Sequence, residues 1–147
     1  MPHAAEREDF GARPARLHAT EVHTDEVPSL VDEVPLLACL AARAEGTSVF
    51  HGVGELRVTE SDRLALVASN LATAGVEARA EADTLFVTGT DRPLRGRVAT
   101  AGDHRLAMAF AVLGTAPGGA LELDDAACVA VSYPDFFQDL VRALTDA

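Results

Sequence analysis

The feature of this sequence that most constrains its fold is a pattern that occurs three times. An apolar helical segment is followed by a glycine and then by a short extended segment. Glycine just after a helix, and helices that alternate with strands, are typical of α/β domains. The helices are expected at residues 36–44, 64–74 and 106–113, and the strands that follow them at 47–51, 76–80 and 120–123.

Four further segments complete the expected order of elements. Strands are expected at residues 15–22, 84–88 and 94–100, and a last helix is expected to start at Pro134. We therefore predict an α/β fold of repeated βαβαββ-type units, of which the second lacks its last two strands. Such a unit leaves a bare sheet edge or a place for strands from elsewhere.

Composition limits the possible functions. The chain has 147 residues, 48% of them hydrophobic, which is enough for one core. A net charge of −11 argues against nucleic acid, and neither a membrane span nor a secretory signal is evident, so a cytoplasmic protein is expected. Cys39 and Cys128 lack metal spacing and are expected to be reduced core thiols, and no metal or cofactor is expected. Residues 1–13 show no periodicity and are expected to form a loose tail.

Charged clusters stand at three of the expected helix starts. They are Asp32 with Glu33, Glu60 with Arg63, and His104 with Arg105. A helix start favours bound anions, guanidiniums suit anionic groups, and carboxylates can transfer protons. If the repeat brings these ends together, they could form one site. Taken singly, each residue could equally be a helix-dipole acid, a cap or a solvated side chain.

Capping residues are expected at the same helix starts. Thr59 with Asp62, and Ser132 with Asp135, fit capping boxes, and Asp103 is a plausible N-cap.

Four segments of the chain resemble motifs of the EPSP synthase family, the 3-phosphoshikimate 1-carboxyvinyltransferases of the shikimate pathway. They occur in the family's order and spacing. The resemblance covers about residues 14–145 and corresponds to roughly the last third of a family member. It implies that residues 14–147 are part of an enolpyruvyl transferase C-terminal domain. The segments are Asp-Glu-Val-Pro at 32–35, Leu-Arg-Val-Thr-Glu-Ser-Asp-Arg-Leu at 56–64, Gly-Asp-His-Arg-Leu-Ala-Met-Ala at 102–109 and Val-Ala-Val-Ser-Tyr-Pro at 129–134.

The resemblance implies roles for individual residues. Asp32 would accept a hydrogen bond from the shikimate hydroxyl that attacks phosphoenolpyruvate, and Glu60 would transfer a proton at the enolpyruvyl carbon. The phosphoenolpyruvate would be held by Arg63, His104 and Arg105.

The chain also departs from the family pattern. Thr59, which would lie with Asp32 beside shikimate 3-phosphate, stands where the family normally has a lysine. Val131 stands where some members of the family have a further lysine. In the family, an N-terminal domain supplies the groups that bind the 3-phosphate.

We therefore expect a C-terminal fragment or split part of an EPSP synthase. The activity would be transfer of the enolpyruvyl group of phosphoenolpyruvate to the 5-hydroxyl of shikimate 3-phosphate, and the chain would be inactive alone. A complementary N-terminal domain chain, or self-association, would complete the fold. The alternatives are a non-catalytic binding or assembly domain, and a related UDP-N-acetylglucosamine enolpyruvyl transferase.

Overall fold

The computed structural model describes residue 11 and residues 13–146, so the expected tail at residues 1–13 lies almost entirely outside the described residues. The first set of elements is β1 (Glu21–Val22), α1 (Val34–Ala41), β2 (Thr47–Phe50), α2 (Arg63–Ala74), β3 (Glu77–Glu81) and β4 (Thr84–Thr88). The second set is β5 (Arg95–Val98), α3 (His104–Leu113), β6 (Ala120–Leu123) and α4 (Phe136–Thr145). Short 3₁₀ helices are η1 (Val27–Ser29), η2 (Val31–Glu33), η3 (Gly54–Val58) and η4 (Ala127–Val131).

The strand pairing confirms the predicted repeat. β1, β2, β4 and β3 form a four-stranded sheet in that order, in which β1 and β2 are parallel and β4 is antiparallel to both its neighbours. β5 and β6 form a separate parallel pair. In each unit a helix, α1 or α3, connects the two parallel strands, as parallel pairing requires. The second unit therefore reproduces the order β-α-β-α of the first and lacks a counterpart of the β3–β4 hairpin among the described residues.

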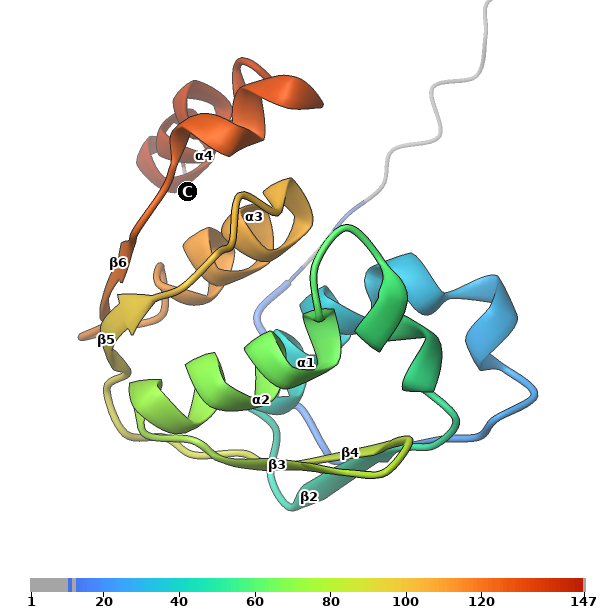
Figure 1. Ribbon diagram of the computed structural model, residues 1–147. Coiled ribbons are helices and arrows are strands. Elements are labelled where there is room, and N and C mark those ends of the chain that lie inside the picture. The colour runs from blue at the N-terminus through green and yellow to red at the C-terminus, as the bar shows by residue number, and fades with distance from the viewer. Residues whose placement is uncertain (1–10, 12, 147) are drawn as a thin grey trace, which may run out of the picture.

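Contacts between the two units are made by helices α1, α2 and α3. α1 and α2 lie on one face of the four-stranded sheet, α3 lies beyond them, and α4 lies at the opposite end of the molecule from β2, β3 and β4 (Figure 1). The side chain of Asn70 in α2 joins the units, because it donates to the Ala99 carbonyl at 2.8 Å and accepts from the Ala99 N–H at 2.9 Å. The largest fully buried side chains include Phe50, Phe110, Leu56, Leu64, Leu71, Leu85, Leu94 and Leu106.

Helix α2 forms where the sequence predicts it, but the residue that caps its start differs from the prediction. The Asp62 carboxylate is the N-cap and accepts from the Ala65 N–H at 2.9 Å, so the expected Thr59–Asp62 capping box is wrong. The Thr59 hydroxyl instead lies within hydrogen-bond distance of two carbonyls of its own loop. At the other end, Gly75 adopts φ +104°, a left-handed conformation that ends the helix as predicted.

Helix α4 differs more from its expectation. It begins at Phe136 rather than at Pro134, and Asp135 makes no side-chain capping bond. Ser132 contacts a histidine of α3 instead, so the second capping box is also wrong. The apolar stripe of α4 stays partly uncovered: Val141 is 61% exposed and Leu144 is 53% exposed, whereas Phe137 and Leu140 are half-buried. By contrast, α2 packs against β3 of its own unit.

The expectations for the first strand and for the two cysteines are confirmed only in part. The strand expected at 15–22 shrinks to β1, preceded by a single bridge between His18 and Glu45. Cys39 is buried in the core as expected and burial raises the pKa of its thiol, whereas Cys128 is only half-buried. Within the described residues, no helix is long and apolar enough to cross a membrane, and no group of three potential metal ligands occurs.

Candidate active site

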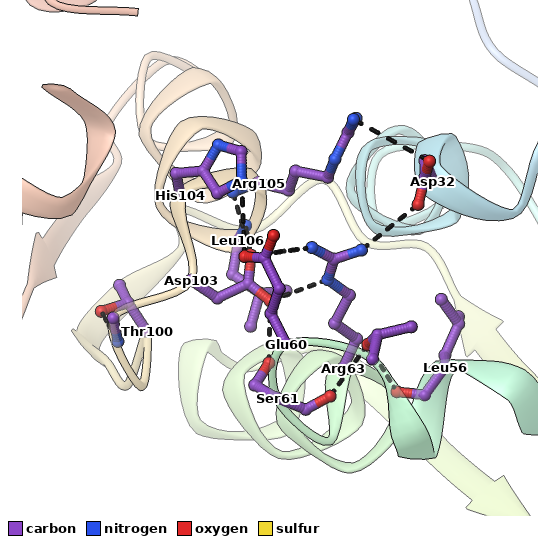
Figure 2. A network of polar contacts seen from close by, with 12 residues as sticks. Asp32, Leu56, Glu60, Ser61, Arg63, Thr100, Asp103, His104, Arg105 and Leu106 are labelled. Carbon is purple, nitrogen blue, oxygen red and sulfur yellow. Dashed lines mark hydrogen bonds and ion pairs between the residues drawn. The ribbon is translucent and has the colours of Figure 1, made fainter. Parts of the chain in front are cut away.

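The N-terminal ends of three helices meet at one polar cluster (Figure 2). η2, just before α1, carries Asp32, the loop before α2 carries Glu60 and Ser61, and Arg63 is the first residue of α2. The start of α3 contributes its own residues, Asp103, His104 and Arg105. The repeat explains this convergence, because α1 and α3 occupy the same position in their respective units and pack against each other.

An ion pair between Arg63 and Asp103 forms the buried centre of the cluster. Arg63 donates from Nε to Asp103 Oδ2 at 2.7 Å, and the Ser61 hydroxyl donates to the same oxygen at 2.8 Å. The side chains of Arg63 and Asp103 are only 3% and 0% exposed. Because a buried charge is costly unless it is paired, each member of this pair fixes the position of the other.

Asp103 also serves as the N-cap of α3, as the sequence predicted. Its Oδ1 accepts from the Arg105 N–H at 3.0 Å. Burial raises the pKa of this carboxyl, but hydrogen bonds from Arg63 and Ser61 and the Arg63 charge outweigh that effect, so the pKa lies below its ordinary value of 3.8. Asp103 is therefore a fixed negative charge that joins α2 to α3.

Two carboxylates lie on the solvent side of Arg63. Asp32 Oδ1 is 3.4 Å from Arg63 Nη1, and its other oxygen is 3.9 Å from Arg105 Nη2. Glu60 Oε2 is 3.6 Å from Arg63 Nη2 and 3.4 Å from His104 Nε2. Both carboxylates are more than half exposed, and Arg105 is 40% exposed. Arg63 is thus enclosed by acids, whereas Arg105 remains accessible to an anion from solvent.

A pocket of about 270 Å³ opens beside the cluster. Asp32 and Arg105 lie at its polar side, and its other walls are largely apolar. A mostly apolar pocket with a few polar groups is the usual form of a small-molecule site. The pocket is lined by Asp32, Glu33, Pro35, Leu36, Arg105, Met108, Ala109, Val112 and Phe136.

The structure brings together five of the seven residues singled out in the sequence: Asp32, Glu60, Arg63, His104 and Arg105. Glu33 lines the pocket next to Asp32. Thr59 stays apart, because its hydroxyl is directed to the backbone of its own loop.

Three residues that belong to the cluster are not predicted as site residues by the sequence. Ser61 is only part of a charged run there, and the spacing of Asp103 and Ser132 predicts caps. No local pattern shows that Asp103 pairs with a residue 40 positions away. For Ser132, the absence of a cap at α4 is visible only in the structure.

The sequence model of the family described as EPSP synthase (3-phosphoshikimate 1-carboxyvinyltransferase) matches residues 3–140. The chain belongs to the EPSP synthase family. Curated relatives agree with this assignment. The 3-phosphoshikimate 1-carboxyvinyltransferase of Methylobacterium sp. is 48% identical over 134 residues, and that of Phenylobacterium zucineum is 43% identical over 138 residues. These matches cover 90% and 92% of this chain but only 30% of each relative.

Solved structures place the fold in the same family. EPSP synthase from Acinetobacter baumannii superposes with a TM-score of 0.81 at 33% identity, covering 87% of this chain and 30% of that one. The enolpyruvyl transferase NikO from Streptomyces tendae superposes with a TM-score of 0.57 at 26% identity, over 86% of this chain and 28% of that one. This chain spans less than a third of the length of the relatives it matches. The matches do not favour the two alternatives, a non-catalytic domain and a UDP-N-acetylglucosamine enolpyruvyl transferase.

Proposed function

We propose that this chain supplies the phosphoenolpyruvate side of an EPSP synthase active site. The observation that carries the proposal is the single network that joins Asp32, Glu60, Arg63, His104 and Arg105 beside an open pocket. In the proposed reaction, the 5-hydroxyl of shikimate 3-phosphate attacks the enolpyruvyl carbon of phosphoenolpyruvate, and phosphate leaves.

The two arginines differ in how they would meet phosphoenolpyruvate. Arg105 is the more exposed, and its contact with Asp32 is long at 3.9 Å, so an anionic group can replace that contact at little cost. Arg63 donates to Asp103 from Nε at 2.7 Å and from Nη2 at 3.4 Å, whereas its Nη1 contacts Asp32 at 3.4 Å. The buried pair thus holds the guanidinium in place, and Nη1 is the nitrogen left for a charged hydrogen bond to the anion.

The carboxylates would carry the proton transfers. Glu60 is exposed to solvent and lies 3.4 Å from His104 Nε2, which suits transfer of a proton at the methylene carbon of phosphoenolpyruvate. Asp32 lies next to the pocket and both arginines, which suits acceptance of a hydrogen bond from the attacking hydroxyl. The side chain of Thr59 carries no positive charge. The groups that bind the 3-phosphate would therefore come from a complementary domain.

The same complementary domain would cover the open side of the second unit. Among the described residues, β6 pairs only with β5, and no residue of α4 is buried. In the first unit the corresponding places are taken by a hairpin: β4 pairs antiparallel with β2, and β3 packs on α2. A hairpin of the complementary domain, paired antiparallel with β6 and packed on α4, is the occupant that the repeat favours.

A titration with phosphoenolpyruvate followed by NMR tests the proposed site in this chain. We expect shifts at the amides of His104 and Arg105, with a dissociation constant weaker than about 1 mM, because only part of the site is present. Arg105→Ala should remove most of the effect. Arg97→Ala is the matched control, because Arg97 is an exposed arginine of β5 in a comparably long surface pair with Glu122.

Two results would contradict the proposed site. One is a wild-type chain whose resonances do not move at millimolar phosphoenolpyruvate. The other is an equal loss of binding in the Arg105→Ala and Arg97→Ala variants, which would indicate only a general effect of positive charge.

A further inference from the structure

We propose that Ser132 is a positioning residue that holds the His104 imidazole with its Nε2–H directed at Glu60. The inference rests on the proposed function, since it assigns the residue that orients one member of that site. Ser132 follows η4, in the loop before α4, and thus belongs to a different element from His104 and Glu60.

The contacts of the imidazole divide between its two nitrogens. Nδ1 lies 2.5 Å from the Ser132 hydroxyl oxygen, and Nε2 lies 3.4 Å from Glu60 Oε2. The His104 side chain is only 15% exposed, whereas Glu60 is 59% exposed and Ser132 is exposed, so the ring is fixed from its solvent side by these two residues. Rotation of the ring would break the shorter of the two contacts.

The chemistry of these oxygens selects one tautomer. An ionised carboxylate can only accept, so its charge, 3.4 Å from Nε2, favours a hydrogen on that nitrogen. In the neutral imidazole Nδ1 is then a bare acceptor, and the hydroxyl of Ser132 donates to it. A hydroxyl can also turn and accept, so Ser132 can remain bonded when both ring nitrogens are protonated.

Comparison of the two repeats shows that the Ser132 hydroxyl bonds to another element and not to its own loop. Thr59 and Ser132 each follow a five-residue 3₁₀ helix and each lie three residues before the aspartate that precedes the next helix. Thr59 directs its hydroxyl to the carbonyls of its own loop, and Asp62 caps α2. Ser132 instead reaches across to α3, and Asp135 caps nothing. In the second loop, the hydroxyl therefore contacts the candidate site, whereas the hydroxyl of the first loop contacts its own backbone.

The consequence for the proposed reaction is a fixed orientation of one donor. With Nδ1 held by Ser132, the neutral ring keeps Nε2–H on the side of Glu60, and it takes up a second proton only at Nδ1, where the hydroxyl can turn to accept. Ser132 thus acts on Glu60 through His104 and need not touch either substrate.

Imidazole nitrogen NMR of the full chain labelled at histidine tests this inference without any substrate. In the neutral form of the wild type we expect His104 to be protonated at Nε2 and bare at Nδ1. Ser132→Ala should populate the Nδ1–H form and move both nitrogen resonances toward each other, whereas Ser132→Thr, which keeps the hydroxyl, should retain the wild-type spectrum. Ser69→Ala is the control, because the exposed Ser69 hydroxyl bonds only within its own helix.

A wild-type ring protonated at Nδ1, or a Ser132→Ala spectrum identical to wild type, would overturn the inference. The phosphoenolpyruvate titration keeps this result separate from the proposed function. Unchanged His104 tautomers together with Arg105-dependent binding would reject only the role of Ser132. Altered tautomers without binding of phosphoenolpyruvate would reject only the proposed function.

Discussion

At the scale of single residues, Asp103 shows how local and long-range roles combine in one side chain. The sequence predicted its role as the N-cap of α3, because an aspartate directly before a helical apolar pattern is a strong local signal. Its pairing with Arg63 and Ser61 was not predicted, because that contact depends on how the two units pack. Burial of this pair makes Asp103 the residue whose loss should affect the site and the fold together.

Asp103→Asn is expected to lower the free energy of unfolding by about 3 kcal/mol at pH 7, since it leaves the Arg63 charge buried without its partner. The folded-state pKa of Asp103 is lowered, so its stabilising contribution is present above about pH 4 and is lost as the pH falls through the folded pKa. The difference in stability between wild type and variant should therefore shrink in acid. Urea unfolding at pH 7 and at pH 3 measures it.

Asp139→Asn provides the control for that experiment. Asp139 pairs with Arg142 on the surface at 3.5 Å, and such exposed pairs contribute at most about 1 kcal/mol. Asp139 also accepts from the Tyr133 hydroxyl at 2.6 Å, and an asparagine oxygen can still accept that bond, so the substitution removes chiefly the charge. Equal effects of the two substitutions at pH 7 would show that the Arg63–Asp103 pair has no special importance.

At the scale of elements, the apolar patterns located the four α-helices and five of the six strands of the described residues to within a few residues. The sequence predicts α2 and its end at Gly75 because the helical spacing of apolar residues over 64–74 is followed directly by a glycine. The two predicted capping boxes are wrong because a Ser or Thr three residues before an Asp also occurs in loops. There the hydroxyl bonds to other groups, as at Thr59 and Ser132. The first strand was overestimated because its moderate alternation covers a segment of which only two residues pair regularly.

The two equivalent helix starts offer an internal comparison of capping. Asp62→Ala should destabilise the chain by about 1 kcal/mol, because it removes a side-chain bond to the N-terminus of α2. Asp135→Ala should change stability by less than about 0.5 kcal/mol, because Asp135 makes no such bond. Thermal or urea unfolding of both variants checks the difference, and a larger effect at Asp135 would contradict the assignment of the caps.

At the scale of the whole molecule, the repeat accounts for both the site and the open surface. It brings the starts of α1, α2 and α3 together, which is why residues at three separate places in the sequence could be grouped as one candidate site. It also shows where the second unit is incomplete, at β6 and α4. Which side chains are enclosed, such as Arg63, and which are accessible, such as Arg105, could not be predicted from spacing.

The exposed face of α4 should drive association. We expect the chain to self-associate at micromolar concentration, since an unpaired strand edge beside an apolar helix face invites further pairing. Val141→Asp on α4 should weaken self-association, whereas Val58→Asp, at a similarly exposed valine in η3, should not. Sedimentation velocity distinguishes these outcomes, and a stable monomer at all concentrations would show that the second unit has closed its own edge.

We propose that this chain provides one side of an EPSP synthase site and requires another domain for the other side. The most direct measurement is phosphate release from phosphoenolpyruvate and shikimate 3-phosphate. The assay would use the chain alone and the chain mixed with the part of the Methylobacterium relative that it does not match. We predict no turnover by either polypeptide alone, turnover by the mixture, and its loss when the mixture contains the Arg105→Ala chain. Turnover by the chain alone, or a stable mixed complex that releases no phosphate, would contradict the claim.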